Sequence, residues 1–439
     1  MEDRSEGKPS LHHSITPRLH HLNHHANVFT RAHTVNKFLH APRKSAIKNG
    51  LVALGLHKVL KLLGASMFGL FLPIFLFEFY GYRAWPVFLY GAVYYLGAAL
   101  MQPLGAKIMT KIGLKKAMIL GVFLYVGFFA SLLLKDVWPV WAVTALSLFF
   151  FIAWHITYWV PFHTAFAEAA PRKKLGSVIG FLAAGRSIIG IAVPILSGWI
   201  ITTFGYSVIM IFAAGIVLLS VLPIFFVKVG EEKFEYGFWE TFKILFSKKE
   251  RSLLTLYAAE GSENAVGFLV WPIFIFLLFQ GRYLEVGAVA TAVVAVSVIM
   301  EIVVGRLADR FNPQRLFRVG ASLTSFGWLM RMFVTTATNV FFVGIFHSLS
   351  YILMNTPFEA IMYTRAADAG HYVDEYTVLR EMALGFGRAA TLLFLIGLVS
   401  LVGFPSAFLV AALATIIFSS AVRSSSKEKI GTIGLAPHP

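Results

Sequence analysis

From Leu51 onward, the chain alternates between long apolar runs and short polar breaks. Twelve runs approach the roughly 20 residues that an α-helix needs to cross a bilayer. They lack the alternation of apolar and polar positions typical of the strands of a membrane β-barrel. The predicted helices span 51–80, 86–106, 116–134, 137–160, 176–203, 206–227, 253–280, 284–304, 317–336, 339–356, 385–402 and 404–422. We therefore expect an all-α integral membrane protein with twelve transmembrane helices.

Composition agrees with a membrane environment. Hydrophobic residues make up 57% of the chain and charged residues 14%, whereas an average soluble domain has about 25% charged residues. The chain has no cysteine, which excludes a disulfide framework and any reaction that needs a thiol. The first fifty residues hold no compact apolar run, so we expect no cleavable signal peptide.

Basic residues predict the orientation of the helices. The net charge is +16, and lysine and arginine concentrate in every second connection, starting with the N-terminal segment. The other connections hold only Arg83, Lys135 and Arg282. By the positive-inside rule, we expect a multi-pass protein of the cell membrane (plasma or inner membrane) with both termini cytoplasmic. Attraction to anionic lipid accounts for the charge, so we expect no nucleic-acid partner.

The sequence also contains an internal repeat. Four short matches recur in the same order at a spacing of roughly 200 residues, and they begin at Pro73 and Pro272, Gly105 and Gly305, Pro161 and Pro357, and Gly185 and Gly387. Two pseudo-symmetric six-helix bundles follow, with a substrate pathway expected at their interface. The predicted parts are a disordered His-rich cytoplasmic tail (1–50), an N-terminal bundle (51–227), a cytoplasmic linker (228–252), a C-terminal bundle (253–423) and a cytoplasmic tail (424–439).

One loop motif carries a family resemblance. The segment "GRLADRFNPQR" at 305–315 resembles the loop signature of the major facilitator superfamily, and the layout over 51–423 is similar to that superfamily. The first-half counterpart at 105–116, "GAKIMTKIGLKK", has Met109 where the family has an aspartate. The resemblance implies alternating access: helices 1, 4, 7 and 10 would line a cavity, and helices 2, 5, 8 and 11 would form the seams between the bundles.

Two carboxylates interrupt the seventh predicted helix. A charged group in hydrocarbon costs several kcal/mol, so Glu260 and Glu263 are functional candidates. At 1.5 Å per residue, Glu263 lies about 25 Å from the outer end of its helix, which puts both residues near the cytoplasmic side. The repeat aligns Glu260 with Lys61, and we expect these two to pair as a gate in the outward-facing state. Glu263 is the expected proton or cation site; solvation by lipid headgroups is the alternative for both glutamates.

Other polar residues complete the predicted substrate or proton site. His347 lies near mid-membrane on the tenth helix, with Ser348 and Ser350 beside it. His155 of the fourth helix and Trp271 of the seventh are further candidates. The alternatives are a hydrogen-bonded core histidine for His347 and simple packing for the aromatic residues.

Charged residues on other helices are assigned to the seams. We expect Arg186 of the fifth helix to form an ion pair with Glu301 of the eighth, joined by Asp309 of the loop motif, because an unpaired charge there would be costly. Arg388 follows Gly387 as Arg186 follows Gly185. We therefore predict that Arg388, like Arg186, has a structural partner at a helix seam. Arg331 of the ninth helix is expected to extend to the outer interface.

No metal, cofactor or catalytic residue is expected. The N-terminal segment holds eight histidines, and a local helix would bring His20 near His24 and His21 near His25, at metal-capable spacing. Nothing apolar would hold such a helix, so we expect disorder there. Oxygen and nitrogen ligands are also scarce at mid-membrane, and neither HExxH nor GxSxG occurs.

These features together predict a secondary active transporter that moves a small amphipathic or hydrophobic solute by alternating access. Proton-coupled efflux is one form of this prediction, the sequence does not fix the direction of transport or the coupling ion, and a monomer is the expected unit. Three alternatives stay open: a nutrient or metabolite uptake carrier, a non-transporting membrane sensor, and an enzyme whose site lies in the segment 357–381 around His371.

Overall fold

The computed structural model describes residues 44–169, 175–227, 230, 234–308, 312–369 and 373–427. It divides into two units, Met1–Ile47 and Lys48–Pro439, and the bundle discussed below lies in the second. Residues 1–43 of the predicted His-rich tail and Asp309 are outside the described residues, and residues 44–50 of that predicted tail are helical.

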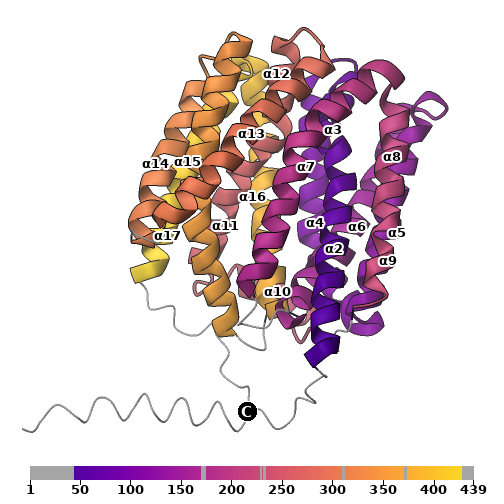
Figure 1. Cartoon of the computed structure of the whole chain (residues 1–439), viewed down its shortest axis with the longest axis vertical. Helices are drawn as coiled ribbons and strands as arrows, with labels where there is room; N and C mark the ends of the chain where they lie inside the picture. The colour runs from indigo at the N-terminus through magenta and orange to yellow at the C-terminus, as the bar shows by residue number, and fades with distance from the viewer. Residues whose placement is uncertain are drawn as a thin grey trace, which may run out of the picture. The chain divides into compact units, whose positions relative to one another are not determined.

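Every element within the described part of the chain is helical, as expected for an all-α protein. The first half, called the N-half, contains α2 (Lys44–Gly69), α3 (Leu72–Phe79), α4 (Ala84–Ile112), α5 (Leu114–Leu132), η2 (Leu133–Asp136), α6 (Val140–Ala169), α7 (Leu175–Phe204), α8 (Tyr206–Leu219) and α9 (Val221–Ile224). The C-half contains α11 (Arg251–Ala265), η3 (Val266–Val270), α12 (Trp271–Leu278), α13 (Tyr283–Ala308), α14 (Pro313–Arg331), α15 (Ala337–Ala369), α16 (Val373–Val402) and α17 (Pro405–Lys427). The short helix α10 (Phe238–Leu245) connects the halves (Figure 1).

Eleven helical segments in the described residues are long and apolar enough to cross a membrane. The ninth predicted span corresponds to α14, which carries Arg315, Arg318 and Arg331 within 19 residues. These arginines lower its hydropathy, although it packs against α15 and α17 as a member of the bundle.

The first helix of each half is interrupted at the same place. Pro73 lies in the first turn of α3, and Pro272 lies in the first turn of α12. Proline has no N–H to donate to the preceding turn, so the α-helical ladder cannot pass through it unchanged. The N-half breaks between α2 and α3, whereas the C-half inserts the π-helical turn η3. Both halves then turn through a glycine with positive φ, 67° at Gly81 and 82° at Gly281, so the sequence repeat has a structural counterpart.

The two halves meet along two seams. Helix α4 packs along α16, and α7 packs along α13 (Figure 1), which confirms the expected seam helices. Glycine permits close approach at the second seam, because a Cβ added at Gly287 would lie 2.3 Å from the carbonyl oxygen of Pro194.

The first helices of the two halves contact each other at one end of the bundle. The loop end is the end with the turns at Gly81 and Gly281, and the linker end is the opposite one. At the loop end α3 packs against α12, and the hydroxyl of Tyr283 donates a hydrogen bond of 2.6 Å to Glu78. These contacts join the two halves at the loop end.

Candidate functional site

Lys61 of α2 points into an aromatic cage formed by Tyr125, Trp154, Tyr158 and Trp159. Its Nζ lies 4.5 to 4.7 Å from the ring centres of the last three residues and 5.7 Å from that of Tyr125. The residue is 5% exposed, and no carboxylate oxygen in the described part of the chain lies within 4.0 Å of Nζ. Cation–π attraction offsets part of the desolvation cost. The cage therefore holds a buried amino group that has no carboxylate partner within 4.0 Å in the described residues.

Hydrogen bonds of His57 support the aromatic cage. His57 lies one helical turn before Lys61, with its Nδ1 2.7 Å from the carbonyl oxygen of Ser220 and its Nε2 2.8 Å from the hydroxyl of Tyr158. A carbonyl can only accept, so Nδ1 carries the proton and, in the neutral ring, Nε2 accepts from the tyrosine. Lys58 adds a second ammonium, 4.3 Å from the ring centre of Phe162.

The C-half contains a different arrangement, the Glu263 cluster, formed by Glu263, Trp271, Trp328, Arg331 and His347. The Trp328 indole N–H donates to Glu263 over 3.0 Å. The guanidinium carbon of Arg331 lies 4.1 Å from the ring centre of Trp271 and 4.2 Å from that of Trp328, and His347 meets Trp328 edge-on at 4.6 Å. The charges of Glu263 and Arg331 act on each other, although their atoms lie beyond ion-pair distance. The cluster thus combines a buried carboxylate with a buried cation.

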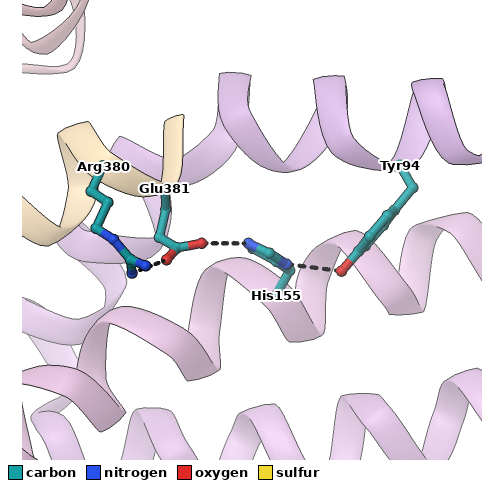
Figure 2. Close-up of polar contacts among 4 residues, drawn as sticks. All are labelled: Tyr94, His155, Arg380 and Glu381. Carbon is teal, nitrogen blue, oxygen red and sulfur yellow. Dashed lines mark hydrogen bonds and ion pairs between the residues drawn. The ribbon is translucent and has the colours of Figure 1, made fainter. Parts of the chain in front are cut away.

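A third group of residues bridges the halves (Figure 2). The hydroxyl of Tyr94 on α4 lies 2.8 Å from Nδ1 of His155 on α6. Nε2 of His155 lies 3.6 Å from the Glu381 carboxylate of α16, which also accepts a hydrogen bond of 3.1 Å from Arg380. This bridging network of Tyr94, His155, Arg380 and Glu381 therefore links α4 and α6 of the N-half with α16 of the C-half.

The surroundings of these groups are positively charged. The ammonium groups of Lys58 and Lys61 lie over the same ring, 4.7 and 4.5 Å from the centre of Trp159. The region therefore favours negatively charged molecules.

The seam residues lie nearer the surface. Nη2 of Arg186 lies 3.5 Å from Oε1 of Glu301, so the predicted contact between α7 and α13 is present. Arg388 faces Tyr95 across the other seam, with 5.0 Å between its guanidinium carbon and the ring centre. Glu260 is half-buried and acts on Arg380 of its own half. Its predicted pairing with Lys61 belongs to the state closed at the linker end and stays a prediction.

Two sequence-based expectations are wrong. Arg331 was expected to extend to the outer interface, but it is 7% exposed between two tryptophans. Glu263 was expected near the cytoplasmic side, but it contacts Trp328 in the last turn of α14. Glu263 lies near the middle of the candidate span Arg251–Leu278, and Arg331 is held between the rings of Trp271 and Trp328.

The remaining predicted site residues are placed as follows. Trp271 and His347 belong to the Glu263 cluster, and His155 belongs to the bridging network. The hydroxyl of Ser350 bonds within its own helix to the carbonyl of Phe346 over 2.8 Å, and Ser348 is half-buried. No group of three or more metal-binding side chains occurs in the described residues.

Several residues of these groups were not predicted from the sequence. Trp328 lies in a helix of low hydropathy, and Arg380 and Glu381 lie before the predicted span 385–402. Helix α16 in fact begins at Val373. The signal for this earlier start was its acidic first turn with Asp374 and Glu375, because acidic side chains stabilise helix N-termini.

Comparisons with known proteins give a consistent fold. The sequence model of the Major Facilitator Superfamily matches residues 58–356. The uncharacterized protein YqgE of Bacillus subtilis (strain 168) is 24% identical over 333 residues, or 72% of this chain and 76% of that protein. The cis,cis-muconate transport protein of Acinetobacter baylyi is 24% identical over 204 residues, or 43% of this chain and 49% of that protein.

Solved structures share the architecture at low identity. A POT family transporter in complex with 5-aminolevulinic acid matches with a TM-score of 0.68 at 11% identity, over 87% of this chain and 96% of that chain. The human organic anion transporter MFSD10 (TETRAN) matches with a TM-score of 0.63 at 13% identity, over 87% of this chain and all (100%) of that chain. At these identities the matches establish the fold.

Proposed function

The chain belongs to the Major Facilitator Superfamily of secondary transporters, which are not enzymes, and on that premise we propose that it carries a small amphipathic organic anion in a proton-coupled cycle. In this proposal the linker end and both termini face the cytoplasm, as the distribution of basic residues indicates, and the monomer is the working unit.

The observation that carries the proposal is the state of Lys61. A buried ammonium with no carboxylate within 4.0 Å in the described residues is costly, and a carboxylate of the solute would supply the missing counter-charge. The faces of Trp154, Tyr158 and Trp159 already surround Nζ. They would contact the apolar body of the same molecule, so the site suits a carboxylate attached to an aromatic or unsaturated group.

Proton coupling is assigned to Glu263. Its carboxylate accepts from Trp328 and lies in the field of Arg331, so gain or loss of a proton would change the balance of a buried charge pair. Such a change can shift the equilibrium between the states closed at either end, which is what coupling requires.

Two similar proteins are consistent with an anionic solute. One is named for the transport of cis,cis-muconate, and another is described as an organic anion transporter. These names concern those proteins and led us to include muconate among the test solutes.

The test uses three solutes of one shape and different charge. The purified protein in proteoliposomes is assayed with benzoate, benzamide and benzylamine, and muconate serves as a dianion. We expect saturable transport of the anions, weak transport of the neutral amide and none of the amine. Equal rates for benzoate and benzamide, or a preference for the amine, would contradict an anion site.

The same vesicles test coupling and direction. A pH gradient that is acidic outside should drive benzoate inward if protons move with the solute, and the gradient of opposite sign should drive it outward. Transport that exchanges solute for protons gives the reverse pattern and indicates efflux. Rates independent of the gradient would remove proton coupling from the proposal.

A further inference from the structure

The short helix α10 presents two large aromatic side chains on its exposed face. Trp239 is 74% exposed and Phe246 is 57% exposed. Lys243 lies between them in sequence and is exposed too, and the spacing of four and then three residues places all three on one face of the helix. The opposite face, with Thr241 and Leu245, is buried.

The helix is fixed to the bundle. Glu240 accepts a 2.9 Å hydrogen bond from the backbone N–H of Gly237 and so completes a cap at the helix start. Leu245 is part of a buried cluster, and α10 contacts both α4 and α16. Its exposed face is therefore presented in a defined direction.

The position of α10 places that face beside lipid. Phe246 lies 5.6 Å from the ring of Phe386, and Phe386 is at the start of the apolar run 385–402. The end of α10 is therefore at a depth where its outward face meets the bilayer boundary rather than bulk water. Tryptophan favours this boundary, because its ring is apolar and its N–H can still reach water or headgroups.

Charge identifies the type of lipid. Lys243 is followed by exposed Lys248, Lys249 and Arg251. None of these four cations takes part in an ion pair in the described part of the chain. Basic residues close to an anionic membrane surface each contribute about 1 kcal/mol of attraction. A helix with apolar aromatic residues and lysines on its exposed side is typical of interfacial binding.

We propose that α10 is a binding surface for anionic phospholipid, with Trp239 and Phe246 inserted among the lipid headgroups and Lys243, Lys248 and Lys249 contacting their phosphates. The surface adjoins the seam between α4 and α16. Just before α10, the N–H of Phe234 donates to Thr110 of α4 over 3.0 Å, and the N–H of Glu235 donates to Glu375 of α16 over 3.1 Å. Lipid bound to α10 thus acts on a segment that ties the two halves together.

The first test locates Trp239. The full chain is placed in phosphatidylcholine vesicles containing phosphatidylglycerol, with acyl chains brominated close to the headgroup. The contribution of Trp239 is the difference in fluorescence between the wild type and Trp239→Phe, which removes one of nine tryptophans. We expect that contribution to be quenched by the brominated lipid and protected from aqueous iodide. Quenching by iodide alone would mean that the face is in water, and protection from both quenchers would indicate a protein partner or a second copy; either result overturns the proposal.

The second test concerns charge. The variant Lys243→Gln, Lys248→Gln, Lys249→Gln should weaken phosphatidylglycerol binding on the order of a hundredfold, measured as the lipid fraction that gives half of the maximal thermal stabilisation. The matched control removes three exposed cations from the same end of the bundle, Lys107→Gln, Lys111→Gln and Lys116→Gln, and should have a much smaller effect. Equal effects of both variants would show general attraction to the membrane and no site on α10.

Discussion

The N-half and C-half place charge differently within the same duplicated fold. In the N-half, Lys61 is surrounded by aromatic faces without a carboxylate within ion-pair distance in the described residues. In the C-half, Arg331 is also stacked on aromatic faces, but Glu263 lies in its field. The N-half site therefore presents a lysine without a carboxylate partner in the described residues, whereas the C-half site contains both a carboxylate and a cation.

In our proposal, this difference gives the Lys61 site and the Glu263 cluster different functions. An open cation site can bind an anion directly, and its occupation changes the local charge. A carboxylate and a cation that already influence each other respond instead to the addition of a proton. In our proposal the repeat supplies two similar scaffolds that carry separate tasks.

The largest effect is expected from Lys61→Met. Methionine is apolar and of similar length, so it can remain among the aromatic rings without the desolvation cost of the ammonium. Loss of one partner of a buried charge pair costs about 3 to 4 kcal/mol, which corresponds to a 100- to 1000-fold weaker affinity for benzoate. Binding of benzoate and benzamide is measured by equilibrium binding to the purified protein. Benzamide should bind equally to wild type and variant, and Lys61→Arg should retain part of the benzoate affinity; unchanged benzoate affinity in Lys61→Met would separate Lys61 from solute binding.

The next largest effect is expected where the halves are bridged. Glu381→Gln keeps the shape of the side chain but leaves Arg380 without its carboxylate partner. Removal of one partner from a fully buried pair costs about 3 to 5 kcal/mol. The Arg380 side chain is 30% exposed, so we expect about 2 to 3 kcal/mol. The measurement is the free energy of unfolding in detergent, with Tyr94→Phe as a milder variant that removes only the hydrogen bond to His155. A stability equal to that of wild type would mean that the network does not hold the halves together.

A smaller effect, confined to coupling, is expected from Glu263→Gln. The amide oxygen can still accept the hydrogen bond from Trp328, so the fold is preserved while the titratable charge is lost. One proton per solute allows up to about tenfold accumulation per pH unit. Gradient-driven accumulation should disappear, and exchange of benzoate without a gradient should continue. Glu260→Gln, one turn earlier on α11, is the matched control and should remain coupled; if both variants stay coupled, the proton site lies elsewhere.

The sequence predicted the fold and part of the site for clear physical reasons. Apolar runs of spanning length identify helices directly, and isolated polar residues within them, such as His155, Glu263 and His347, stand out because burial is costly. Lys61 was also identified, but only as a gate residue. Its aromatic neighbours come from α5 and α6, and sequence periodicity on one helix does not show which residues of another helix face it.

Other site residues were not predicted, because hydropathy locates a membrane span but does not locate the ends of its helix. Helix α16 begins twelve residues before the apolar run that predicted it, so Arg380 and Glu381 lie before the predicted span. Asp374 and Glu375 are buried in its first turn, where contacts with other segments replace water. Arg331 was misplaced for a related reason: a cation at a helix end usually extends to water, and tertiary stacking on two tryptophans overrode that tendency.

The smallest effect is expected at the Arg186 and Glu301 contact, the more exposed link between the halves. The side chains are 60% and 38% exposed and their nearest atoms are 3.5 Å apart. Exposed ion pairs contribute about 0.2 to 1 kcal/mol and are screened by salt, so Arg186→Gln should lower the free energy of unfolding by less than 1 kcal/mol. The charge-reversed pair Arg186→Glu with Glu301→Arg should recover most of that loss at low salt and show no difference from wild type at high salt. A loss comparable to that of Glu381→Gln would instead show that this seam contributes as much to the joining of the halves as the buried bridging network.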